Sequence, residues 1–519
     1  MSVQDTRLTT GEEVSAKLKL ATELARLARR GEALELLTHC DDWEHPYNEK
    51  GLLVAAEVLA RRDPIEALEF LAVHSEDFAS AESRFAYLVT SAFCYVNTRN
   101  FDAAREMLSS AADLVRDDLT RAARLGYERS RLAWATRHYD PNSDDMALAM
   151  SDPSPDAQFK ALGLRSWMRA GLEDYAGQVQ DLLAAFRQFQ SHSKTCEITA
   201  VALYLRGLLR LAVETGNNEA VAAGEAAYEM IEWTPDIQEH QFLCVRALAW
   251  YAFQQGDSGR AQWLLKDSKE LAPTLAWQVW AHADRAYVAR LNGNQAWAAE
   301  ELAQADSIAQ EVEWDTTHDE ERYALVMLAD LFSSTDMAQA QRYVSIHTKL
   351  GRDSIDPTIA AAHDRRAVAY AKYAAGEVQA MLGNVKLAKE SLEFSYETFA
   401  RIGHSYRAAL AAAALFRLTE DTNWLEKARS EAGRFPKSPF FRRLSELDKV
   451  EEQRVLSGLT PMQRQLAVAF SQGADLDDLS LRFSRSRFTI NKQIEAIFES
   501  LGVHSRHTLR AELRQRGIL

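Results

Sequence analysis

Paired helical segments that repeat along the chain constrain its fold more than any other sequence feature. Between residues 15 and 430, an apolar-periodic segment leads into a short turn with Gly, Asn or Asp, and a second segment begins with small residues. Ala103 and Ala104 follow one such turn, and Ala298 and Ala299 follow another. Small residues there let antiparallel helices approach closely, and Gly or Asn in the turn tolerates a left-handed backbone. The pattern predicts helical hairpins.

The turns recur at a nearly regular spacing. Successive candidate turns are 32 to 47 residues apart, and they lie near Gly31, Asp63, Asn100, Tyr139, Gly171, Gly216, Gly256, Gly293, Asp336, Gly383 and Asp421. Repeats of this length are typical of α-solenoids, in which each hairpin packs on its neighbours. No segment shows a competing strand pattern. We expect an all-α chain in which residues 1–435 form an α-solenoid.

These segments resemble degenerate tetratricopeptide (TPR) repeats, especially the longer variety found in MalT-like regulators. The resemblance implies a concave surface that binds a peptide, a protein or a small-molecule effector. The sequence contains no G-x-x-x-x-G-K-[ST] loop, so the ATPase module of the large MalT-like regulators is not expected.

Tryptophan is concentrated in one part of the array. Seven of the eleven tryptophans fall between Trp233 and Trp314. Trp250, Trp277 and Trp280 could line an aromatic effector pocket. The alternative, which we favour, is that these rings fill space between helices.

The net charge of −15 is unevenly distributed. From Arg454 to Leu519 there are ten Lys and Arg against six Asp and Glu, a net of +4. The preceding 453 residues therefore carry 50 basic and 69 acidic groups, a net of −19. Because acidic surfaces repel DNA phosphates, any contact with nucleic acid is expected in the C-terminal segment.

This C-terminal segment reads as four short helices. Thr460 can cap the first, which Gly473 ends, and Ser486 can cap the third, which Gly502 ends. A fourth helix is expected over 507–516. The third helix has an apolar stripe that leaves its opposite face free, formed by Ile490, Ile494, Ile497 and Leu501. Two helices joined by a short turn, the second with polar residues outward, indicate a helix-turn-helix.

The same segment resembles the C-terminal domain of LuxR/FixJ/GerE-type transcription regulators. The pattern matches without a gap at Leu459, Thr460, Gly473, Leu479, Ser486, Thr489, Ile490, Ile497, Leu501, Val503 and Arg506. The resemblance implies a LuxR-type helix-turn-helix domain over 458–519, preceded by a helical connector over 436–457. It also implies a homodimer that associates through the fourth helix.

The resemblance places double-stranded DNA against the third helix. The residues expected to contact it are Arg485, Ser486, Arg487, Thr489, Asn491, Lys492, Gln493 and Arg506. The sequence departs from the family at Asn491, Gln493 and Ser500, where a basic residue, a histidine and a lysine are usual. Each lost phosphate contact lowers the salt dependence of binding by about 0.9 in log-log slope. A degenerate domain retained for dimerisation or protein contact is the alternative.

Other functional classes find less support. His192 and Cys196 share a four-residue spacing without a second pair, so no metal site is expected. No nucleophile–base constellation is evident, and we expect neither an enzyme nor a cofactor. The sequence offers no signal core or apolar run of about 18 residues, and we expect no membrane association. The cysteines lack a C-x-x-C pair, which favours reduced thiols and a cytoplasmic location: Cys40, Cys94, Cys196 and Cys244.

Together these features predict a DNA-binding transcription regulator whose solenoid binds an effector or partner that controls the helix-turn-helix. The rival is a TPR adaptor or anti-activator whose C-terminal domain contacts protein. An enzyme regulated by its repeats is a third hypothesis.

Overall fold

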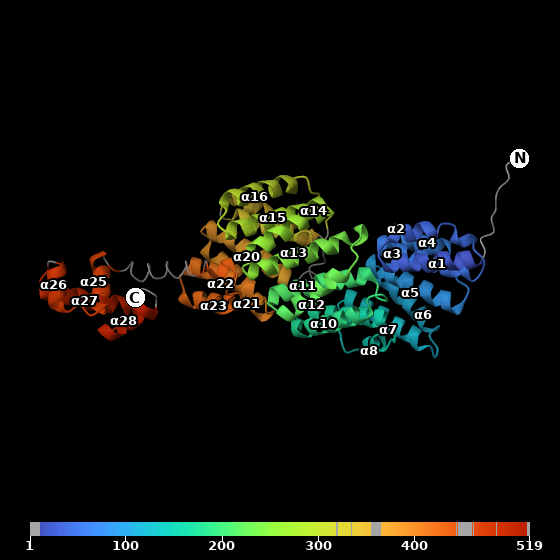
Figure 1. The fold of residues 1–519 in the computed structure, drawn as a ribbon, viewed down its shortest axis with the longest axis horizontal. Coiled ribbons are helices and arrows are strands. Elements are labelled where there is room, and N and C mark those ends of the chain that lie inside the picture. Colours follow the sequence, from blue (N-terminus) through green and yellow to red (C-terminus); the bar gives the residue numbers. More distant parts are fainter. Residues whose placement is uncertain are drawn as a thin grey trace. The chain divides into compact units, whose positions relative to one another are not determined.

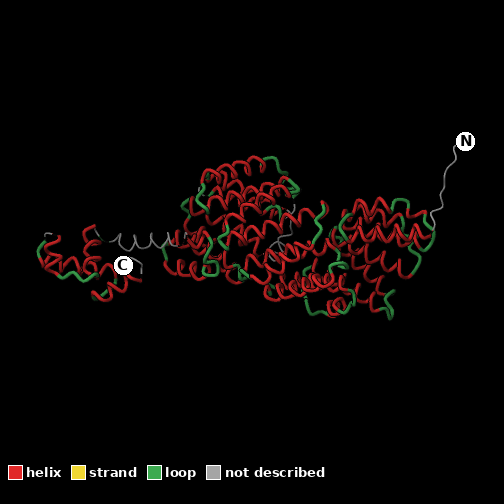
Figure 2. The backbone as a smooth tube through the Cα atoms, in the orientation of Figure 1, coloured by secondary structure: helices red, strands yellow, loops and turns green. Residues whose placement is uncertain are grey.

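All regular structure in the described part of the chain is helical (Figure 2). The computed structural model describes residues 11–317, 320–333, 335–353, 365–442, 444, 459, 461–483 and 485–515. The chain divides into two compact units, residues 1–434 and 435–519. We call the first the solenoid-like unit and the second the C-terminal unit. Most of the connector expected over 436–457 lies outside the described residues.

The solenoid-like unit is built from helical hairpins in chain order (Figure 1). Its first half contains α1 (Gly11–Arg26), α2 (Arg30–Leu36), η1 (Cys40–Asp42), α3 (Tyr47–Arg62), α4 (Pro64–Val73), α5 (Ala81–Asn97), α6 (Phe101–Ala112), α7 (Leu119–Ala135), α8 (Asp144–Met150), α9 (Pro155–Gly171) and α10 (Tyr175–His192). Its second half contains α11 (Ile198–Thr215), α12 (Asn218–Met230), η2 (Pro235–Ile237), α13 (Gln238–Gln254), α14 (Ser258–Leu271), α15 (Leu275–Leu291), α16 (Gln295–Ala309), α17 (Tyr323–Phe332), α18 (Met337–Asp353), α20 (Arg365–Met381), α21 (Val385–Arg401), α22 (Ser405–Thr419) and α23 (Thr422–Ala432). The predicted all-α class is confirmed.

Several turn residues predicted from the sequence cap helices or adopt a left-handed backbone in the structure. Asp63 and Asn100 cap α4 and α6, where each side chain accepts a hydrogen bond from a backbone N–H of the first turn. Gly256 and Gly293 lie in hairpin turns at φ +79° and +83°, where a Cβ atom would be strained. These residues stop one helix and start the next, so the hairpins are fixed locally.

Small residues bring the helices of a hairpin together. Ala104, Ala261 and Ala388 follow their turns and are fully buried. Close approach also occurs between hairpins: a methyl group on Gly163 of α9 would overlap the ring of Tyr204 in α11. Successive first helices pack on one another along most of the array, for example α15 on α17 and α17 on α20. This stacking is the solenoid-like arrangement that the repeats predict.

Segments of this unit that are far apart in the sequence also contact one another. The Arg30 backbone N–H donates to Asp236 Oδ2 at 2.7 Å, and Thr234 Oγ1 donates to the Ala28 carbonyl at 3.0 Å. Further along, α11 packs against α22, and Glu214 lies 3.1 Å from Nε2 of buried His404. Helix α11 contacts the N-terminal end as well, because Arg30 Nη2 donates to Thr199 Oγ1 at 3.1 Å.

The C-terminal unit has a core of its own. Its helices are α25 (Pro461–Ser471), α26 (Leu476–Phe483), α27 (Arg487–Leu501) and α28 (Arg506–Gln515). The core residues come from all four helices and their flanks: Leu459, Leu466, Ala467, Ala469, Leu479, Ile490, Ile494, Ile497, Val503, Leu509 and Leu513. The apolar stripe predicted for the third helix thus faces inward.

Candidate functional site

Helix α27 begins and ends where the sequence indicates. The Ser486 hydroxyl accepts a hydrogen bond from the Thr489 backbone N–H at 3.2 Å, and Gly502 ends the helix at φ +64°. Asp475 caps α26 by accepting from the N–H groups of Asp477 and Asp478, both at 2.8 Å. Thr460, the predicted cap of the first helix, lies outside the described residues.

The free face of α27 carries most of the residues expected to contact DNA. Arg485, Arg487, Asn491 and Lys492 are exposed, whereas Thr489 and Gln493 are half-buried. Several of these groups already have partners. Arg487 lies 3.5 Å from Asp477 of α26, the Asn491 amide donates to Glu495 at 2.9 Å, and Lys492 lies 5.2 Å from the Phe488 ring centroid. Exposed pairs of this kind are weak and can exchange partners.

Charge on the two helices is nearly balanced. From Asp475 to Leu501 there are four basic residues, Arg482, Arg485, Arg487 and Lys492, against five acidic ones, Asp475, Asp477, Asp478, Glu495 and Glu499. The positive excess of the segment therefore comes from flanking residues such as Arg510 and Arg514 on α28, both exposed. The outward face of α27 also carries Phe488, whose side chain is 71% exposed.

Arg506 has a different environment from the other predicted DNA contacts. Its guanidinium donates to the Ala474 carbonyl at 2.5 Å and lies 4.0 Å from the Phe470 ring centroid. These groups belong to the end of α25 and the turn after it, whose carbonyls lack helical partners. In this position Arg506 ties α28 to α25 inside the unit.

The predicted effector tryptophans are buried among other side chains. Trp277 and Trp280 stack with ring centroids 5.3 Å apart, and they are 2% and 6% exposed. Arg246 lies 4.1 Å from the Trp280 ring centroid. The Trp250 indole N–H donates to buried Asp284 at 2.9 Å. This placement matches the packing interpretation that the sequence favours.

One of these three rings, Trp250, lines a cavity. Trp250 borders a cavity of about 60 Å³ lined by residues of α11, α13, α20 and α22, which we call the inner pocket. Its polar and aromatic lining also includes Arg210, Glu214, Gln254, Tyr370, Tyr406 and Arg407. These residues could not be grouped from the sequence, because they come from four separate hairpins. The available signal was an arginine within an apolar stretch of a hairpin's first helix, as at Arg246 and Arg407.

Three arginines meet at the inner pocket, and two have carboxylate partners. Arg246 forms a bidentate ion pair with Asp284, and Arg210 lies 3.5 Å from the Glu320 carboxylate. Arg407 instead packs against rings, with its guanidinium carbon 4.8 Å from the Tyr370 centroid and 5.7 Å from that of Trp250. Burial lowers the pKa of Arg407, but Tyr370, Tyr287 and Asp330 raise it above the ordinary value, so the group stays charged.

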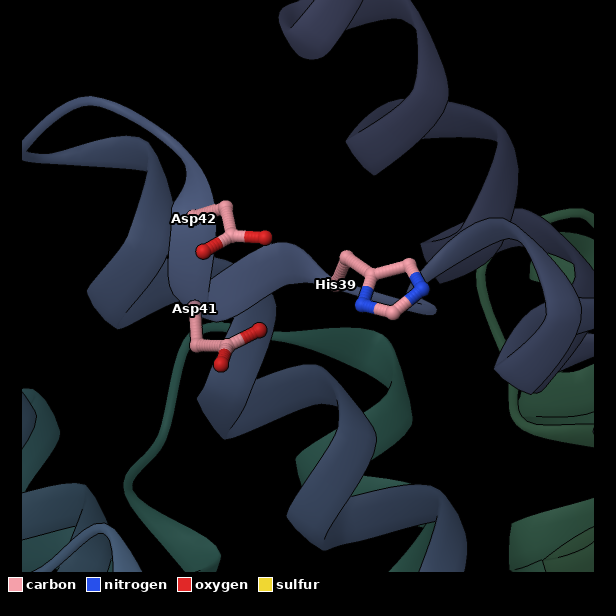
Figure 3. Close-up of side chains that lie close together, drawn as sticks. All are labelled: His39, Asp41 and Asp42. Atoms are coloured by element: carbon pink, nitrogen blue, oxygen red, sulfur yellow. The ribbon is translucent and has the colours of Figure 1, made fainter. Parts of the chain in front are cut away.

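Two groups of potential metal ligands differ in exposure. His39, Asp41 and Asp42 gather around η1 with ligand atoms within 4.8 Å of one another, and all three are exposed (Figure 3). Exposed acidic groups commonly cluster without an ion, so we assign no site there. In the pair noted from the sequence, Cys196 is buried and His192 is exposed, with His192 Nδ1 3.2 Å from the Gln188 carbonyl oxygen.

No helix in the described segments combines the length and the apolar composition that a bilayer span requires.

Comparison with known proteins yields only weak similarity. No protein-family model and no curated protein matches the chain. Among solved structures, one of Naa15/Naa10 bound to HypK-THB shares 12% identity over 98% of this chain and 92% of that chain, with a TM-score of 0.23. A circular tandem repeat protein with novel repeat topology shares 15% identity over 97% of this chain and 99% of that chain, with a TM-score of 0.14. These TM-scores are too low to support an argument about fold or function.

Proposed function

We propose that the chain is a DNA-binding transcription regulator in which α27 enters the major groove. In this proposal the C-terminal unit is a LuxR-type helix-turn-helix domain, and the solenoid-like unit binds an effector that controls it. One observation carries the proposal: α27 buries its apolar stripe and exposes Arg487, Asn491 and Lys492 near its N-terminal end. Arginine and lysine there can contact phosphates, and asparagine can pair with an adenine edge.

Dimer formation belongs to the same proposal. Because α26 and α27 together carry no positive excess, one unit offers limited attraction to DNA. Two copies on paired half-sites double the contacts. The outer face of α28 offers His507, Arg510 and Arg514, whereas Leu509 and Leu513 are buried within the unit.

The proposal is tested by replacing two exposed cations of α27 in the full-length protein. The R487A/K492A variant should bind its preferred duplex about tenfold or more weakly, because two phosphate or base contacts are lost. The slope of log affinity against log salt should become less steep by about 1.8 if both contacts are to phosphates. A gel-shift or anisotropy titration against DNA upstream of the coding sequence, at several salt concentrations, measures both effects.

Lys386 provides a matched control for charge removal. It lies on α21 of the solenoid-like unit, and its side chain is 90% exposed. K386A should leave both affinity and salt slope unchanged. Equal weakening in the control and in R487A/K492A would contradict a specific role for α27.

A second function is favoured by the composition of the same surface. The exposed ring of Phe488 and the carboxylates of Glu495 and Glu499 suit a protein partner better than a phosphate backbone. Under this function the chain is an adaptor or anti-activator and prefers no genomic DNA over random duplex. F488S would then disrupt the association, and K492A would change it little.

A further inference from the structure

One arginine that lines the inner pocket, Arg407, forms no ion pair with a carboxylate of the described residues. Arg407 contacts the rings of Tyr370, Trp250 and Tyr287, with centroid distances of 4.8, 5.7 and 6.0 Å. Within the described ranges, no carboxylate forms an ion pair with it at 4.0 Å or less. Glu214, on the same pocket wall, is already engaged with His404 at 3.1 Å and accepts from the Tyr370 hydroxyl at 3.3 Å. A largely desolvated guanidinium with only ring contacts favours a bound counter-anion.

Two further polar atoms at the pocket lack hydrogen-bond partners. Gln254 is 4% exposed, and its Oε1 accepts no hydrogen bond. The buried Nε of Arg210 donates none. Both residues line the same cavity as Arg407. Buried polar groups are almost always satisfied, so these atoms mark where a ligand would donate and accept.

The size of the cavity restricts the ligand. At about 60 Å³, the space accommodates roughly four to six non-hydrogen atoms, since one water needs about 10–15 Å³. Drug-sized ligands need several hundred Å³. Flat aromatic walls and planar guanidinium groups suit a planar carboxylate, which arginine can hold through two parallel hydrogen bonds.

We propose that the inner pocket binds a short hydroxy- or amino-carboxylate, the size of glycolate or glycine. Its carboxylate accepts from Arg407 and Arg210, and its hydroxyl or amino group donates to Gln254 Oε1. Because the pocket joins α11 and α13 to α20 and α22, the ligand would connect hairpins far apart in the sequence. The inference deepens the proposed function by naming the class of effector, but the binding itself needs no DNA.

Binding is measured on the full-length protein without DNA. Calorimetry and tryptophan fluorescence, for which Trp250 is a pocket reporter, are recorded with glycolate, glycine, acetate and inorganic phosphate as separate probes. We expect glycolate or glycine to bind with a dissociation constant between about 10 µM and 10 mM, and acetate, which lacks the donor, to bind more weakly. Binding of phosphate alone would overturn the carboxylate assignment. Binding of none of the probes would overturn the site.

Two variants locate the ligand. R407M should weaken binding by about ten- to a hundredfold, because a charge-assisted contact is lost. R260M, which removes an exposed arginine on α14, should change nothing. Q254L keeps every charge and should remove the preference for glycolate over acetate. If R407M does not fold, Q254L decides the question, and an unchanged preference contradicts the proposal.

The outcome is separable from the DNA question. A protein that binds glycolate or glycine through Arg407 but prefers no DNA would contradict the proposed regulator and leave the pocket assignment intact. The reverse result would remove the pocket and leave the regulator.

Discussion

Single side chains in the solenoid-like unit take much of their chemistry from burial. All four cysteines are free and buried. Burial raises the pKa of the Cys40 thiol to about 11 and that of the Cys94 thiol to about 12. A thiol reacts as its thiolate, so both the closed packing and the raised pKa suppress reaction at neutral pH.

We therefore predict that iodoacetamide at pH 8 leaves the native chain unmodified and modifies all four thiols in urea. Intact mass after a timed reaction gives the number of added groups. Complete modification without denaturant, at the rate of a free thiol, would contradict the buried placement.

Burial also shifts the pKa of His240 on α13, but downward, and this shift makes stability depend on pH. Burial, together with the nearby cations Arg206 and Arg30, lowers the pKa of His240 to about 3. The unfolded chain, with an ordinary histidine pKa near 6.5, binds this proton more readily than the folded chain does. Stability from His240 is thus present above about pH 6.5 and is lost as the pH falls below it.

The expected consequence is a pH-dependent difference between wild type and H240Q. Between pH 7 and pH 5, the free energy of unfolding should fall more steeply for wild type, by at most about 1.4 kcal/mol per pH unit from this one group. Urea unfolding at several pH values measures the two slopes. Parallel slopes would show that His240 titrates normally in the folded protein.

At the scale of helices, short-range signals in the sequence were sufficient to predict where several helices begin and end. Asp63, Asn100 and Gly256 act within one or two turns of the chain, so their effects follow from backbone geometry alone. The same holds for Ser486 and Gly502 at the ends of α27. Packing between hairpins is less visible, because it depends on which faces meet. Gly163, which receives the ring of Tyr204, was not identified from the sequence.

This contact gives a paired test of helix packing. G163A should destabilise the protein by about 1–2 kcal/mol, since overpacking against Tyr204 outweighs the gain in helix propensity. The control is Gly207 on α11, where an added methyl group meets nothing within 4 Å. G207A should stabilise by about 0.5–1 kcal/mol. Urea midpoints at constant slope measure both changes, and equal effects of the two substitutions would refute the packing argument.

For the molecule as a whole, the sequence indicated stacked hairpins, but it did not indicate which distant hairpins contact one another. The contacts of Arg30 with Asp236, and of α11 with α22, join segments about 200 residues apart. Such returns depend on the small rotation added by each repeat, which no local motif encodes. The inner pocket exists only because of these returns, so its residues could not be grouped in advance. The tryptophan cluster includes one pocket residue, Trp250 on α13, whereas Trp277 and Trp280 on α15 serve packing.

Charge is the whole-chain property that bears most on function. The preceding 453 residues carry a net of −19, and the last 66 carry +4. Under the proposed function, attraction to DNA is therefore confined to a small part of the chain, and within it to a few exposed cations. The proposed regulator would then take a large share of its preference for one duplex over another from specific contacts rather than from bulk charge.

The most direct test is selection of genomic fragments by the purified full-length protein at about 150 mM salt, with and without glycolate and glycine. A small set of fragments should bind about a thousandfold or more tightly than random duplex. The R487A/K492A variant should lose this preference. Equal affinity for genomic fragments and random duplex under every condition would contradict the central claim.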